Sequence, residues 1–114
     1  MSVEDSVRDH YRRDDLEGVV LAALERVGAD PDALRIEDLS GIDQLHAGGI
    51  DSTTHLLDRL DLAEGTTVLD VGCGIGGGAR WAAHESGAHV TGIDLSPVFV
   101  DVARALTDRV GLGD

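Results

Sequence analysis

The feature that most constrains the fold of this chain is a run of glycines between a strand-like segment and a helix-like segment. Residues 66–71 are mainly β-branched or apolar and have the length of a strand. Glycines then recur from Gly72 to Gly78, and residues 79–86 are expected to form a helix that Gly87 ends. Glycines at such a junction allow a sharp turn and let a ligand approach the backbone. The segment therefore predicts a ligand-binding loop.

The pattern continues with a second strand and a further helix. Residues 89–93 have strand character. Ser96 and Pro97 have the residue types expected at the N-cap and first position of a helix, which should end near Gly111. Strand–helix–strand connections of this length favour a parallel pair. The predicted fold class is therefore α/β, with a β-α-β-α unit of parallel strands.

A helical lead-in is predicted before this unit. Residues 15–28 have apolar side chains at helical spacing, and a second helix is expected from Ser52 to Leu60, capped by Asp51 or Ser52. Residues 37–49 are predicted to be irregular. The apolar face of the first helix consists of Leu16, Val19, Val20, Ala23, Leu24 and Val27.

The chain is thus divided into a lead-in or lid segment, residues 1–62, and the α/β unit, residues 63–114.

The formal net charge is −13 and there is no lysine, which argues against nucleic-acid binding because phosphate contacts need clustered cations. No apolar run is long enough for a membrane span, and the charged start predicts no secretory signal, so a cytoplasmic protein is expected. Cys73 is the single cysteine, and no Cys/His cluster has zinc spacing, so no metal site is predicted.

Two carboxylates define the chemistry expected at the loop. Asp94 follows the second strand, about 20 positions after the first glycine, where an acidic residue accepts hydrogen bonds from ribose. Gly72, Gly74 and Gly77 also match the dinucleotide pattern GxGxxG. Asp70 argues against that ligand, because a carboxylate beside the turn repels a pyrophosphate. It attracts an ammonium group such as that of S-adenosylmethionine (SAM).

Two segments resemble known methyltransferases. Residues 68–77 (VLDVGCGIGG) and 90–96 (VTGIDLS) resemble class I SAM-dependent methyltransferases. Residues 43–49 (DQLHAGG) are similar to a subgroup that acts on small molecules, including sarcosine/dimethylglycine N-methyltransferases and quinone C-methyltransferases. The resemblance implies the N-terminal portion of a Rossmann-like SAM-methyltransferase fold, with SAM as cofactor and a small-molecule methyl acceptor.

The resemblance also assigns roles to residues. Asp70 would orient the SAM ammonium, Asp94 would hold the ribose hydroxyls and Leu95 would pack on the adenine. Cys73 is interpreted as a small filler, because nothing in the sequence activates its thiol. The implied cofactor-binding residues are Asp70, Gly72, Cys73, Gly74, Gly76, Asp94 and Leu95.

The lead-in supplies candidates for the substrate side. Tyr11 and His46 are weak candidates for catalytic residues, and Gln44, Gly48 and Gly49 join them as candidates for a substrate-binding lid. Because the sulfonium of SAM is already activated, the protein is expected to contribute mainly positioning and exclusion of water.

Two strands make a small sheet with open edges, which leaves several interpretations. We expect a truncated methyltransferase that has little or no activity alone. The alternatives are a non-catalytic SAM-binding or interaction module completed by a partner chain or a second copy at the open edge, and a fragment of an NAD(P)-binding oxidoreductase.

Overall fold

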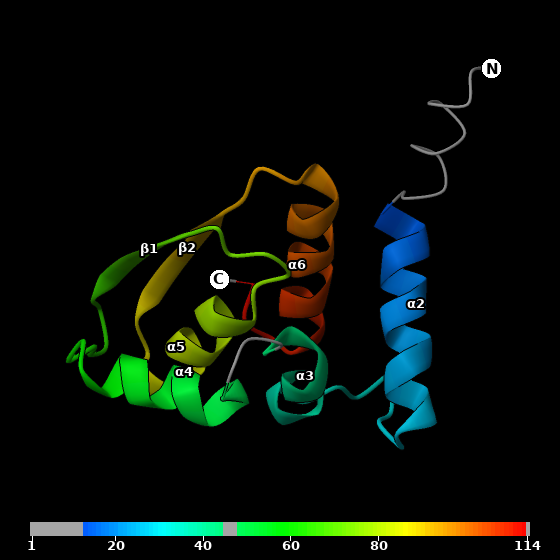
Figure 1. Ribbon diagram of the computed structural model, residues 1–114, viewed down its shortest axis with the longest axis horizontal. Coiled ribbons are helices and arrows are strands. Elements are labelled where there is room, and N and C mark those ends of the chain that lie inside the picture. Colours follow the sequence, from blue (N-terminus) through cyan, green and yellow to red (C-terminus); the bar gives the residue numbers. More distant parts are fainter. Residues whose placement is uncertain (1–12, 45–47, 114) are drawn as a thin grey trace.

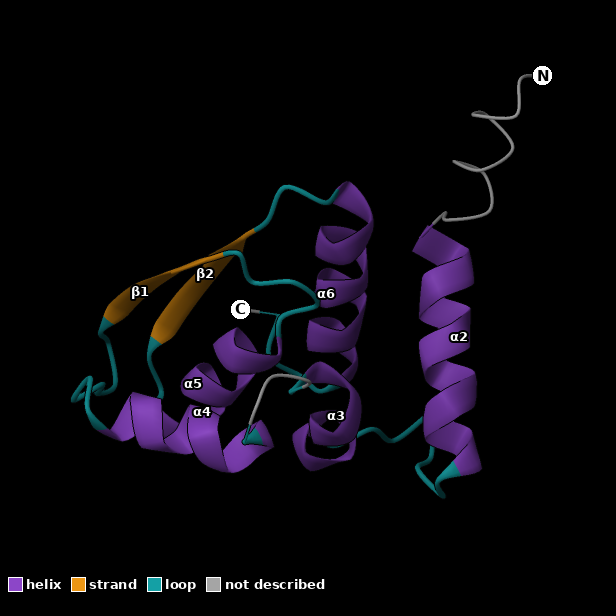
Figure 2. Ribbon diagram, in the orientation of Figure 1, coloured by secondary structure: helices purple, strands orange, loops and turns teal. Residues whose placement is uncertain are grey.

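The computed structural model describes residues 13–44 and 48–113, which form five helices and a two-stranded sheet (Figures 1 and 2). The elements in chain order are α2 (Arg13–Arg26), α3 (Ile36–Asp43), α4 (Gly49–Asp58), β1 (Thr67–Val71), α5 (Gly77–Ser86), β2 (His89–Ile93) and α6 (Pro97–Arg109). None of the helices in these ranges is long and apolar enough to cross a membrane.

The sheet confirms the predicted β-α-β-α unit. Strand β1 pairs with β2 in parallel, with Thr67 opposite His89 and Asp70 opposite Gly92. Helix α5 connects the two strands and packs against β2. The carboxyl ends of both strands therefore lie at one edge, where the glycine-rich loop leaves β1.

Local signals fix the ends of α5 and α6. Gly87 has a φ of +73° and donates its N–H to the carbonyl of Ala83 at 2.9 Å, so it ends α5 as predicted. Ser96 is the N-cap of α6, where its hydroxyl accepts the N–H of Phe99 at 3.3 Å, and Pro97 opens the helix. Both helix assignments from the sequence are confirmed.

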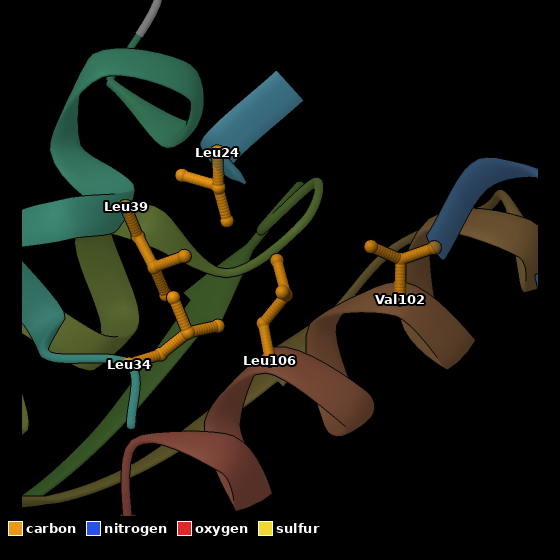
Figure 3. Close-up of a cluster of buried hydrophobic side chains, with 5 residues drawn as sticks. All are labelled: Leu24, Leu34, Leu39, Val102 and Leu106. Carbon is orange, nitrogen blue, oxygen red and sulfur yellow. The ribbon is translucent and has the colours of Figure 1, made fainter. Parts of the chain in front are cut away.

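The buried apolar cluster lies between the lead-in and α6. Figure 3 shows side chains from α2, α3 and α6 pointing toward one another. Helices α2 and α6 lie side by side in Figure 1, and α3 packs against both α2 and α5. The cluster consists of Leu24, Leu34, Leu39, Val102 and Leu106. The lead-in is thus packed onto the α/β unit.

The predicted irregular stretch at residues 37–49 is wrong for its first part, which forms α3. Ser40 and Gly41 have poor helix propensity and suggested a loop. Leu39 is fully buried, however, and its packing outweighs that propensity. The start of α3 is also fixed, because the Asp38 carboxylate accepts the backbone N–H of Arg35 at 2.9 Å. That bond lowers the pKa of Asp38.

Two further details of the lead-in differ from expectation. Helix α4 begins at Gly49, with left-handed Gly48 (φ +87°) as N-cap and no side-chain cap, so the predicted cap at Asp51 or Ser52 is wrong. In α2, Val19 is 65% exposed and Val27 lies beyond the end of the helix. Leu21, which the predicted face omitted, packs against the core instead.

One face of the sheet is left exposed by the described residues. Side chains alternate along a strand, and Leu69 and Val71 of β1 lie on the same face as Ile93 of β2. All three are exposed, whereas Val68 and Val90 on the opposite face are partly buried. The helical layer therefore covers one side of the sheet.

Candidate cofactor-binding site

The glycine-rich loop is tied to the end of β2. The backbone N–H groups of Gly72 and Cys73 both donate to the carbonyl of Ile93, at 2.8 and 2.9 Å. Gly72, Gly74 and Gly76 have φ values of +77°, +56° and +90°, which residues with a Cβ rarely adopt. The turn therefore depends on glycine at these three positions.

The surface of this loop has room for a ligand. A Cβ added at Gly72 or Gly74 would meet no atom within 4 Å. The same holds at Gly78, in the first turn of α5, where backbone N–H groups have no acceptor within the helix. The loop thus presents backbone without side chains, and the first N–H groups of α5, to open space.

Asp94 is fixed at the carboxyl end of β2. Its Oδ1 accepts the N–H of Ser96 and its Oδ2 accepts the N–H of Gly74, both at 2.9 Å. These two bonds, led by that from Ser96, lower the pKa of Asp94. Because each carboxylate oxygen can accept a second hydrogen bond, the ionised side chain can still receive two hydroxyl donors. This remaining acceptor capacity fits the two hydroxyl groups of a ribose.

Asp70 is placed differently. It lies on β1 opposite Gly92 and is partly buried. Burial raises the pKa of Asp70, and within the described ranges it forms no ion pair. Its negative charge is therefore not compensated by a cation of these segments. This environment fits a ligand that brings a positive group.

Cys73 serves as packing between the loop and β2. A Cβ added at Gly92 would lie 2.9 Å from the Cβ and Sγ of Cys73, so the thiol occupies the space that a side chain would need there. Burial, and then the charges of Asp70 and Asp94, raise the pKa of Cys73. The thiol thus stays protonated, which supports the interpretation of a small filler.

The residues after Asp94 present an apolar surface. Leu95 is fully exposed, and Phe99, in the first turn of α6, is 44% exposed. Leu95 had been expected to pack on an adenine, whereas Phe99 was not recognised from the sequence. The sequence does show Phe99 as an aromatic residue in the first turn of the helix that follows Asp94.

The lead-in candidates are only partly described. Tyr11 and His46 lie outside the described residues. Gln44 is 5% exposed, and its Oε1 accepts the hydroxyl hydrogen of Thr53 at 2.6 Å, which places it inside the junction of α3 and α4. Gly48 and Gly49 form the start of α4. Gln44 is therefore buried between two helices, where it contributes to their packing.

Sequence reasoning missed a buried ion pair beside the loop. Arg80 of α5 donates from Nη2 to Oδ2 of Asp43 at 2.8 Å, and the two side chains are 2% and 3% exposed. Burial raises the pKa of Asp43, while Arg80 opposes this shift. Charged residues 37 positions apart carry no local sequence signal of their pairing.

An open pocket of 490 Å³ adjoins the loop and is lined mainly by residues of α5, β2 and α6. Cys73, Gly76 and Arg80 contribute to its walls, but Asp70 and Asp94 do not. Because the two carboxylates lie outside it, we assign the candidate site to the open surface of the loop. Residues 13–44 and 48–113 contain no group of three His, Cys, Asp or Glu side chains placed to hold a metal ion.

Comparisons with known proteins agree on one family. The family model described as "Mycolic acid cyclopropane synthetase" matches residues 41–114. The chain is 47% identical over 70 residues to phosphoethanolamine N-methyltransferase 1 of Triticum aestivum, a match that covers 61% of this chain and 14% of that protein. It is 40% identical over 108 residues to 2-methyl-6-phytyl-1,4-hydroquinone methyltransferase of Synechocystis, covering 91% of this chain and 29% of that protein.

A solved structure gives the same result. Phosphoethanolamine N-methyltransferase 2 of Haemonchus contortus, in complex with S-adenosyl-L-methionine, matches with a TM-score of 0.57 and 37% identity. The match covers 61% of this chain and 16% of that one. The chain therefore spans less than a third of the length of each of these relatives.

Proposed function

This chain belongs to the mycolic acid cyclopropane synthetase family of SAM-dependent methyltransferases, and from that premise we propose that its glycine-rich loop binds SAM for methyl transfer to a small molecule. The observation that carries the proposal is the Asp94 carboxylate, which two backbone N–H groups fix at the end of β2 with capacity left for two hydroxyl donors. Asp70 adds a negative charge on the neighbouring strand, with no cationic partner among the described residues.

Each residue has a defined part in this proposal. Asp94 accepts hydrogen bonds from the ribose hydroxyls, and Asp70 attracts the ammonium of the methionine portion, directly or through water. The backbone of Gly72 and Gly74 lies along the ligand, where a Cβ would project into open space. Leu95 packs on the adenine. The bound cofactor supplies a methyl group that its sulfonium already activates, so these residues contribute orientation.

The methyl acceptor is proposed only as a class. The relatives are named for phosphoethanolamine and for a phytyl hydroquinone, which are both small molecules. Since the chain spans 14% and 29% of those two proteins, we assign none of its described residues to acceptor binding. Little or no turnover by this chain alone remains a prediction, as does a cytoplasmic location.

Calorimetric titration with S-adenosylhomocysteine tests the cofactor assignment. We expect the wild-type chain to bind, and Asp94→Asn to bind at least about tenfold more weakly, because a hydrogen bond to a charged acceptor is lost. Asp58→Asn is the matched control, since Asp58 is an exposed carboxylate at the end of α4. Binding of NADH in place of S-adenosylhomocysteine would contradict the assignment and favour the oxidoreductase alternative.

An interaction role is the second candidate, favoured by the exposed apolar sheet face formed by Leu69, Val71 and Ile93. In this alternative, a partner chain or a second copy covers the sheet. Size-exclusion chromatography with light scattering distinguishes the cases for self-association. A mass above that of one chain, reduced to one chain by Leu69→Ser, supports a second copy, whereas a concentration-independent monomer argues against it.

A further inference from the structure

The last residue of α3 and the first turn of α5 meet directly beneath the glycine-rich loop. Arg80 donates from Nη2 to Asp43 at 2.8 Å and from Nη1 to the carbonyl of Ala103 and the hydroxyl of Thr107, both at 3.3 Å. One guanidinium group thus joins α3, α5 and α6. Arg80 is only 2% exposed, so it does not reach the ligand surface itself.

Arg80 and Asp43 also contact the backbone of the loop and of the first turn of α5. A Cβ added at Gly76 would lie 2.7 Å from Nη1 of Arg80, and Gly76 has a φ of +90°. A Cβ added at Gly77 would overlap the backbone carbonyl of Asp43. Arg80 also donates its backbone N–H to the carbonyl of Gly76 at 2.9 Å. Gly76 of the loop therefore lies against the guanidinium of Arg80, and Gly77, where the loop enters α5, lies against the backbone of Asp43.

We propose that the buried pair of Arg80 and Asp43 is a positioning device that holds the glycine-rich loop in its ligand-binding conformation and couples it to the lead-in helix α3. The outer side of the loop is held by Asp94 through the N–H of Gly74. The pair holds its inner side at Gly76 and Gly77. This inference rests on the proposed function insofar as it concerns cofactor affinity.

That the pair is buried and charged indicates a role in positioning the loop and not in stability alone. A buried ion pair loses much of its Coulombic gain to desolvation, and an apolar pair of similar volume is often as stable. Here Oδ1 of Asp43 and Nε of Arg80 are buried without a hydrogen-bond partner among the described residues. Because two of its polar atoms lack hydrogen bonds within the described chain, the ion pair contributes little to stability. Its hydrogen bonds are directional, however, so it fixes the positions of three helices and the loop relative to one another.

The test measures S-adenosylhomocysteine binding to the full 114-residue chain in Arg80→Met, Asp43→Asn and the double variant. We expect each single variant that remains folded by circular dichroism to bind about tenfold more weakly or worse. The double variant should bind about as weakly as the singles, because both act through one contact. Asp43→Asn keeps the side-chain shape, so it tests the proposal even if Arg80→Met does not fold.

Arg109→Met is the matched control. Arg109 also joins distant elements, since it pairs with Glu17 of α2 at 3.4 Å and donates to the carbonyl of Pro31 at 3.2 Å, but it does not contact the loop. We expect this variant to lose stability and to keep wild-type affinity while folded. Equal affinity in the wild type, Asp43→Asn and Arg80→Met would overturn the proposal and leave the cofactor assignment intact.

A second readout does not depend on cofactor binding. Amide hydrogen exchange of Gly74 and Gly76, whose N–H groups are hydrogen-bonded, should accelerate in Asp43→Asn and Arg80→Met but not in Arg109→Met. If the wild type binds no S-adenosylhomocysteine while this acceleration is observed, the proposed function fails and the positioning role stands. Unchanged exchange at both glycines would overturn the positioning role whatever the affinity.

Discussion

At the scale of single residues, the two aspartates of the site have opposite environments. Asp94 accepts two backbone N–H groups, which lower its pKa, so it is a fixed and ionised acceptor. Asp70 is partly buried without a cationic partner in the described segments, and burial raises its pKa. The first environment suits neutral hydroxyl donors, and the second suits a ligand with a positive charge.

Proton release on ligand binding is the prediction that follows for Asp70. Burial lets the folded chain hold the Asp70 proton at pH values where the unfolded chain has lost it, so this group favours folding as the pH falls through its raised pKa. A bound ammonium reverses that preference. We therefore expect S-adenosylhomocysteine binding to weaken, and to release a proton, as the pH is lowered from neutral toward the ordinary carboxyl value of 3.8.

Titration calorimetry in two buffers of different ionisation enthalpy measures this release. Asp70→Asn should abolish the buffer dependence and bind roughly tenfold more weakly at neutral pH, because a contact with a charged group is lost. Proton release that persists in Asp70→Asn would assign the titration to another group.

At the scale of elements, the first turn of α5 contains two adjacent glycines with different surroundings. Gly77 abuts the backbone of Asp43, whereas a Cβ at Gly78 would meet nothing within 4 Å. Gly77→Ala should therefore displace α3 and lower both the free energy of unfolding and the cofactor affinity. Gly78→Ala should leave stability unchanged or raise it by up to about 1 kcal/mol, since alanine is the better helix former.

Denaturant unfolding of the two alanine variants beside the wild type checks this difference. The pair is well matched, because both changes add one methyl group to neighbouring positions of the same turn. Equal unfolding free energies for the two variants would show that α3 does not rest against α5 as described.

The N-cap of α6 gives a second prediction for an element. Ser96→Ala removes the acceptor of the Phe99 N–H, and we expect the free energy of unfolding to fall by about 1 kcal/mol. Ser96→Asp keeps an acceptor at the helix N-terminus and should restore stability. Thermal unfolding followed by circular dichroism measures both, and a loss of stability common to both variants would contradict a capping role.

Sequence patterns predicted the β-α-β-α unit because its signals are local. Gly72, Gly87 and Ser96 each determine a turn or a helix end through their own backbone preferences. Helix α3 was not predicted, because burial of Leu39 against distant residues outweighs its local propensity. Likewise, Arg80 belongs to a charged residue class that is usually exposed, and only the tertiary fold brings it to Asp43.

At the scale of the whole molecule, the apolar core and the candidate site occupy different places. The buried cluster joins α2, α3 and α6, as Figure 3 shows, while the loop and its carboxylates lie at the end of the sheet. Two contacts link them: Ile75 of the loop packs against the cluster, and Arg80 joins α3 to α6 next to the loop. Away from these two contacts, stability and ligand binding should therefore respond to different substitutions.

Two leucines in contrasting environments test where the stability of the fold lies. Leu106 is fully buried in the core, and Leu69 is 61% exposed on the sheet. Leu106→Ala should lower the free energy of unfolding by about 2–5 kcal/mol, because it leaves a cavity. Leu69→Ala should change it by less than about 0.5 kcal/mol, as expected for a surface position.

Urea unfolding at two protein concentrations shows whether the exposed sheet face contacts water or a second copy of the chain. If Leu69→Ala has little effect at both concentrations, the exposed face of β1 and β2 is in contact with water. If its effect is comparable to that of Leu106→Ala and grows with concentration, a second copy of the chain buries Leu69 and contributes to stability by mass action. The second result would favour self-association through the sheet face.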